Sequence, residues 1–246
     1  MRGFKLSVWL MIPLLGTAYH YGPGQERLKL DDVQGHLSAA RASVDAEEYA
    51  QAVKSFTTAL AALPAERKQD AARIRVERAK AMLHAEQLPE AYDELTLLLP
   101  ELQDDPDTDP ALLAEAREGL ANSKYYLTWL MRLEGEPRTE WEPEIEASRQ
   151  TYRLLAEQAA ENGDHEATRR HQEDLEAAIR LARMDLTDLQ ALPLPSQCRG
   201  CCSGQCQCKG KGKGRGKGEG KSQKKEQGDK FARGASSGPP PDGGGN

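Results

Sequence analysis

The sequence lacks the motifs on which most enzymes depend. It has no glycine-rich loop that follows a strand and cradles phosphates, and no strand–turn–helix pattern that would expose a nucleophile. Glutamates gather in residues 140–146, but carboxylates gather in the same way on any solvated helix face, so they identify no acid–base pair. We therefore expect a protein that is not an enzyme.

Aromatic residues are scarce, at 5% of the chain, and the C-terminal part contains only Phe231. Proteins that hold single-stranded nucleic acid stack the bases on aromatic side chains, so no nucleic-acid partner is expected. The net charge of −6 hides a division, because residues 196–246 carry 11 Lys and Arg against 4 Asp and Glu. We expect this basic tail to be a solvated linker, or else to contact polyanions such as anionic lipid.

Long hydrophobic runs are also missing, apart from one near the N-terminus. Arg2 and Lys5 form a positive region before an apolar stretch over 6–15, and small residues follow at 16–18. This order is typical of a secretory signal peptide over residues 1–18. The stretch is shorter than the roughly 20 apolar residues that span a bilayer. Export to the periplasm or cell envelope is expected, with an uncleaved membrane anchor as the alternative.

Residues 49–64 have the spacing of a helix with one face of small and aromatic residues. Tyr49, Ala52, Phe56 and Ala59 recur every three or four residues, so they share one side of the helix. The two alanines allow a neighbouring helix to approach closely. Pro64 then ends the helix.

The stretch at 49–64 resembles the second helix of a tetratricopeptide (TPR) repeat, a helical hairpin of roughly 34 residues. The first helix of that hairpin would cover about 32–46, where Ala39 and Ala40 replace the Leu-Gly pair usual in the family. The resemblance extends over 33–100, and residues 111–191 continue as further helical pairs. It implies an all-α fold, a short α-solenoid of antiparallel helical hairpins over 31–192, after a linker over 19–30.

Apolar spacing and helix breakers predict where the later helices lie. We expect helices at 67–87, from Leu88 to Pro100, at 111–134, from Pro143 to about Ala159, and at 165–191, with a loop over 104–110. Pro100 should either end its helix or bend it. The run Asn162-Gly163-Asp164 should end one helix and cap the next. Aromatic residues of the third hairpin are assigned to packing between helices: Tyr125, Tyr126, Trp129 and Trp141. His165 and His171 are six residues apart, so they should fall on different helix faces and share no metal.

The TPR resemblance also implies a binding groove, because the first helices of TPR hairpins line a concave surface that holds a peptide or a partner helix. The matching positions in this chain are Gln34, Leu37, Arg41, Val44, Arg73, Val76, Lys80 and Leu83. Arg41, Arg73 and Lys80 would make the groove basic and suited to acidic peptides. The carboxylate clamp of some TPR domains is not implied, because Leu37 and Arg41 replace its Lys and Asn. The function implied is a protein–protein interaction scaffold.

All five cysteines lie outside the predicted helical body: Cys198, Cys201, Cys202, Cys206 and Cys208. Thiolates at these spacings suit a soft ion such as Zn²⁺ or Cu⁺. In an exported chain they can instead form disulfides, within one chain or between two. The alternative function is therefore metal handling or thiol–redox chemistry through this cluster, with no other cofactor expected. Order should end at Pro195, in a Pro/Cys-rich segment over 193–208, and residues 209–246 should be disordered.

Overall fold

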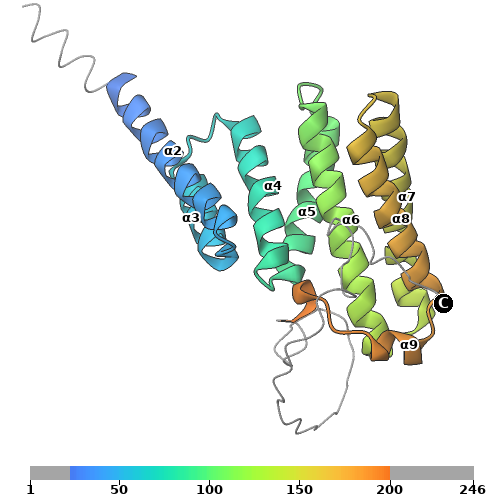
Figure 1. The fold of residues 1–246 in the computed structure, drawn as a ribbon. Coiled ribbons are helices and arrows are strands. Elements are labelled where there is room, and N and C mark those ends of the chain that lie inside the picture. The colour runs from blue at the N-terminus through green and yellow to red at the C-terminus, as the bar shows by residue number, and fades with distance from the viewer. Residues whose placement is uncertain (1–22, 200–246) are drawn as a thin grey trace, which may run out of the picture. The chain divides into compact units, whose positions relative to one another are not determined.

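The computed structural model describes residues 23–199, and this part of the chain contains helices and no strand. The predictions for the signal peptide, the disordered tail and four of the cysteines lie outside the described residues. The helices are α2 (Pro23–Asp45), α3 (Tyr49–Ala62), α4 (Lys68–His84), α5 (Leu88–Asp104), α6 (Pro110–Leu133), α7 (Arg138–Glu161), α8 (His165–Arg183), α9 (Leu186–Ala191) and a 3₁₀ turn η1 (Ser196–Cys198) (Figure 1). They form two compact units, divided after Ala81 within α4.

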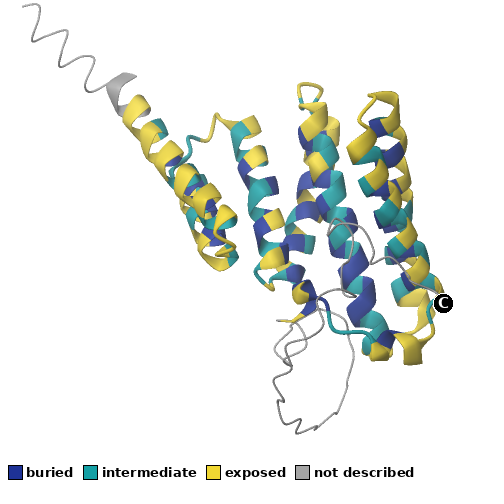
Figure 2. Ribbon diagram, viewed as in Figure 1, coloured by how far each residue is buried: buried dark blue, intermediate teal, exposed yellow. Residues whose placement is uncertain are grey.

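The first unit contains the hairpin of α2 and α3. Ala52, Phe56 and Ala59 are buried on one face of α3, which confirms the predicted stripe, and Tyr49 at its end is half-buried. Figure 2 shows both buried and exposed residues along the larger helices. Helix α3 packs against α2, whose own buried residues recur at a spacing of seven. Helix α3 ends before Pro64 because the preceding residue takes an extended conformation, as steric contact with a proline ring requires.

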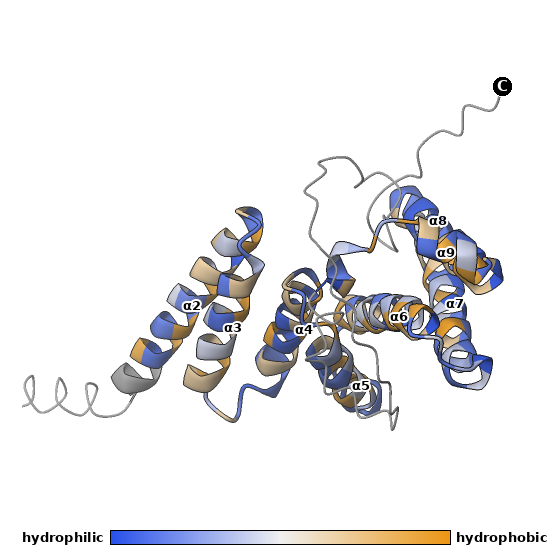
Figure 3. Cartoon of the chain, turned by 90° about the horizontal axis from the view of Figure 1, so that it is seen from below, coloured by the Kyte–Doolittle hydropathy of each residue, from blue (hydrophilic) through white to orange (hydrophobic). Residues whose placement is uncertain are grey.

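The second unit packs α5, α6, α7 and α8 in chain order, each helix against the next. Each of these helices carries both hydrophobic and hydrophilic residues, as amphipathic helices do (Figure 3). The predicted packing role of the aromatics is confirmed, because Tyr125, Tyr126 and Trp129 are buried in the core. The rings of Tyr125 and Tyr126 meet edge to face with centroids 5.2 Å apart, and Trp141 is half-buried against the same core.

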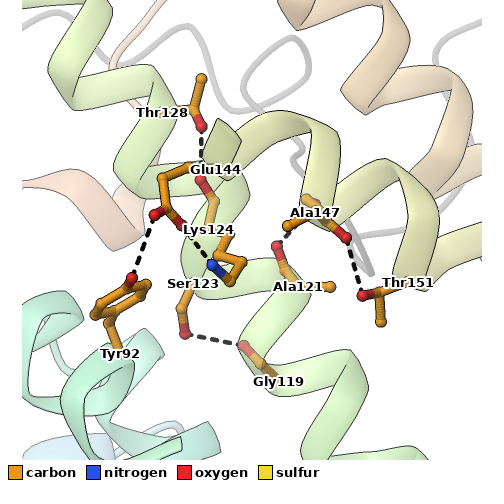
Figure 4. Close-up of polar contacts among 10 residues, drawn as sticks. Tyr92, Gly119, Ala121, Ser123, Lys124, Thr128, Glu144, Ala147 and Thr151 are labelled. Carbon is orange, nitrogen blue, oxygen red and sulfur yellow. Dashed lines mark hydrogen bonds and ion pairs between the residues drawn. The ribbon is translucent and has the colours of Figure 1, made fainter. Parts of the chain in front are cut away.

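A hydrogen-bonded group holds three helices of this unit together (Figure 4). Lys124 Nζ on α6 donates to Glu144 Oε2 on α7 over 2.6 Å, and the hydroxyl of Tyr92 on α5 lies 3.4 Å from Glu144 Oε1. Burial and the Glu144 charge raise the pKa of Tyr92 above its usual value. The three side chains are partly buried, so they stabilise the packing of α5, α6 and α7.

The helix start predicted at Pro143 is wrong, and Pro100 does not end its helix. Helix α5 continues through Pro100 to Asp104, and α7 begins at Arg138, five residues before Pro143. A proline inside a helix removes one hydrogen bond, to the carbonyl four residues earlier. Both prolines and both of those earlier residues are exposed, so water can bind the freed carbonyls.

The single helix predicted over 165–191 is in fact two, because Met184 is extended and separates α8 from α9. The carbonyl groups at the end of a helix need hydrogen-bond donors from elsewhere. Arg132 on α6 supplies them, since its guanidinium donates to the carbonyls of Leu181 and Met184. The same guanidinium lies over the ring of Trp141, 4.9 Å from its centroid.

The predicted loss of order after Pro195 is also wrong for residues 196–199. The turn η1 packs against α6, and both Gln197 and Cys198 are buried. Leu192 and Leu194, just before the turn, pack against the core of the second unit. The helix that the turn contacts, α6, lies far away along the chain.

Candidate functional site

The residues predicted to line a groove divide by polarity. Gln34 and Arg41 on α2 and Arg73 and Lys80 on α4 are exposed. The four apolar residues are half-buried (Leu37, Val44) or buried (Val76 and Leu83, at 0% and 5% exposure). Leu83 belongs to the core of the second unit. The polar half of the predicted set is therefore the more accessible to a partner.

An ion pair places the accessible parts of α2 and α4 side by side. Arg41 Nε and Nη2 donate to Glu77 Oε2 and Oε1 over 3.0 and 2.8 Å, a two-pronged arrangement. The hydrogen bonds that Arg41 donates to the Glu77 carboxylate raise the pKa of Arg41. Glu77 follows Arg73 by four residues and precedes Lys80 by three, so all three lie on one side of α4. We call Gln34, Arg41, Arg73, Glu77 and Lys80 the α2–α4 face.

The α2–α4 face is less basic than the sequence predicted, because Glu77 was not counted. It carries three cations and one anion, and the anion is held by Arg41. The sequence did contain the information, since Glu77 has the helical spacing of the two α4 residues that were assigned to the groove. The pairing of Glu77 with Arg41 depends on how α2 and α4 lie in the fold, which the sequence does not give.

A second group of functional interest lies in the second unit and was missed. One donor atom each from Glu118 on α6 and from His171 and Asp174 on α8 lie within 4.8 Å of one another. His171 is 5% exposed and Asp174 3% exposed. His171 Nδ1 lies 3.8 Å from Asp174 Oδ2, beyond hydrogen-bond length. We call these three residues the polar cluster.

The spacing of α8 contained a clue to the polar cluster. The buried residues of this helix are His171, Asp174, Ala178 and Leu181, separated by three, four and three residues. Two polar side chains thus occupy positions on the buried stripe, and His171 Nδ1 has no hydrogen-bond partner there. The prediction had considered His171 only together with His165, and His165 is exposed.

The cysteine prediction can be followed for one of the five residues. Cys198 is fully buried, and its Sγ lies 3.7 Å from the carbonyl oxygen of Tyr126. Cys201, Cys202, Cys206 and Cys208 lie outside the described residues. A metal ion shared by all five would have to reach a sulfur that is enclosed by the core of the second unit.

Comparison of the chain with protein-family models, with curated proteins and with solved structures gave no match. Among the described residues no helix combines the length and the apolar character needed to cross a membrane.

Proposed function

We propose that the chain is an exported, non-enzymatic scaffold of the TPR type, which binds a peptide or protein partner through the α2–α4 face. The observation that carries the proposal is the Arg41–Glu77 pair. It sets the first helix of one hairpin against the first helix of the next, which is how helical-hairpin solenoids build a continuous binding surface. The all-helical structure, in which α2 packs on α3 and α5 to α8 pack in chain order, supports the same conclusion.

The chemistry of this face favours a polar, acidic partner. The face carries three cations, Arg41, Arg73 and Lys80, against one anion, Glu77. The apolar residues that could contact a hydrophobic helix are wholly or partly buried. Exposed charges contribute more to the rate and specificity of association than to its affinity. Binding of an acidic segment to this face should therefore weaken as salt is added.

A photo-crosslinking amino acid placed at Gln34 tests this proposal in the cells that produce the protein. Gln34 lies on the α2–α4 face, while Gln51 is equally exposed but lies on α3 and serves as the matched control. We expect discrete adducts with a partner protein from position 34 and none from position 51. Equal labelling from both positions, or none from position 34, would contradict the proposal.

Charge reversal tests whether the partner recognises the charges of the α2–α4 face or merely lies near it. The double substitution Arg73→Glu with Lys80→Glu should lower the adduct yield from position 34 by about tenfold, the effect of roughly 1.4 kcal/mol. The control Lys29→Glu with Lys54→Glu makes the same change of charge at exposed positions off the face. An equal loss in both double variants would indicate a general effect of net charge and would refute recognition by this face.

A further inference from the structure

We propose that Glu118, His171 and Asp174 form a binding site for a divalent transition-metal ion, with Zn²⁺ as the best fit. The site belongs to the second unit and uses no residue of the α2–α4 face. It is therefore independent of the proposed scaffold function.

The positions of His171 and Asp174 are the first reason. They occupy the buried stripe of α8, where apolar residues would stabilise the helix packing without cost. Burying a polar group without a hydrogen bond costs about 1–3 kcal/mol. His171 Nδ1 is buried and has no hydrogen-bond partner. An ion between the imidazole and the carboxylates would satisfy this nitrogen.

The geometry is close to that of a three-ligand site. The donor atoms lie within 4.8 Å of one another, whereas donors about 2.0–2.2 Å from a tetrahedral zinc are about 3.4 Å apart. His171 and Asp174 are fixed on one helix at the i, i+3 spacing. The side chain of Glu118 is 19% exposed, so it can turn toward the other two and also leaves a path from solvent.

The donor set selects the kind of ion. Imidazole nitrogen suits Zn²⁺ and its transition-metal neighbours, while Mg²⁺ and Ca²⁺ prefer oxygen donors throughout. The two carboxylates carry a charge of −2 and the imidazole is neutral, so a divalent ion and its three ligands have no net charge. With three protein ligands, a fourth coordination position would remain for water.

One neighbouring cation competes with the metal. Arg170 Nε lies 3.8 Å from Glu118 Oε1, and the Arg170 side chain is 43% exposed. Without an ion, this guanidinium balances part of the carboxylate charge. Metal binding must turn Glu118 away from it, so removing the charge of Arg170 should strengthen metal binding.

The test uses the full chain with Cys201, Cys202, Cys206 and Cys208 replaced by Ser, because these thiols would bind the probe themselves. Co²⁺ serves as the visible probe and Zn²⁺ displaces it. We expect one ion per chain, without sulfur-to-cobalt charge-transfer absorption. His171→Gln should weaken binding by at least about tenfold. His165→Gln, an exposed histidine on the same helix, should leave it unchanged, and Arg170→Gln should strengthen it.

Several outcomes would overturn the proposal. These are no ion bound at micromolar concentrations, equal affinity in the His171 and His165 variants, or strong sulfur-to-cobalt absorption that assigns the ion to Cys198. A metal-independent ion pair predicts instead that His171→Gln lowers the melting temperature equally with and without Zn²⁺. Should circular dichroism show that His171→Gln fails to fold, Glu118→Gln provides the second test, because this partly exposed residue tolerates the substitution more readily. Retention of full affinity in Glu118→Gln would likewise refute the site.

Discussion

Two glycines of this chain stand in opposite backbone conformations. Gly35 lies inside α2, where an added Cβ would meet no atom within 4 Å. Gly163 has φ of +73° in the turn between α7 and α8, and its neighbour Asp164 accepts a hydrogen bond from the backbone of Ala167. The predicted stop and restart at 162–164 is confirmed by these contacts.

Alanine substitutions at the two glycines should therefore act in opposite directions. Gly35→Ala should stabilise its unit by about 1 kcal/mol, because alanine is the better helix former and the site is open. Gly163→Ala should destabilise the fold by about 1 kcal/mol, because a side chain disfavours positive φ. Thermal unfolding followed by circular dichroism measures both. Shifts of the melting temperature in the same direction would disprove this assignment.

At the scale of an element, the end of α8 depends on a residue from another helix. Arg132 binds two carbonyl groups there and lies over Trp141. Arg138 also lies near the ring of Trp141, 6.0 Å from its centroid, but is exposed and pairs with Glu142 in the next helical turn. The two arginines thus share an aromatic neighbour and differ in their hydrogen bonds to backbone.

Arg132→Met should lower the free energy of unfolding by about 2 kcal/mol, because the charge-assisted hydrogen bonds to two carbonyls are lost. Arg138→Met should cause no measurable change, since exposed ion pairs contribute little. Chemical denaturation of both variants is the measurement. An equal effect of the two substitutions would mean that contact with Trp141, and not the carbonyl binding, holds the end of α8.

At the scale of the whole molecule, buried tyrosines limit stability at high pH. Burial raises the pKa of Tyr125 and of Tyr152 well above the usual value near 10. The folded state keeps these two protons at a pH where the unfolded state has released them. The ionisation of these two tyrosines therefore has no effect on stability below about pH 10 and destabilises the fold increasingly above it.

A pH titration can follow tyrosinate absorbance and helix content together. We expect Tyr125 and Tyr152 to ionise only as the helices melt. Tyr125→Phe should reduce the late step of absorbance. If all seven tyrosines ionised near pH 10 while the helix content stayed constant, the burial of Tyr125 and Tyr152 would be refuted.

The helices themselves followed from the sequence, because their causes are local. The stripe of Ala52, Phe56 and Ala59, the stop before Pro64 and the turn at Gly163 depend on residues a few positions apart. The sequence rules failed where contacts with residues distant in the chain, or exposure of the backbone to water, changed the local structure. Pro143 did not begin its helix, because water can bind the carbonyl that the proline leaves free.

The candidate sites needed the tertiary structure. Pairing of Arg41 with Glu77 joins residues 36 positions apart, and the polar cluster joins Glu118 to a helix that begins 47 residues later. Helical spacing tells which side chains share a face, but only packing decides which face meets which. The sequence by itself determined an all-helical chain with amphipathic hairpins, since helical periodicity depends on residues that are close together in the chain. Packing alone decided the charge partners, the end of α8 and the burial of Cys198, because those contacts form only when distant helices come together.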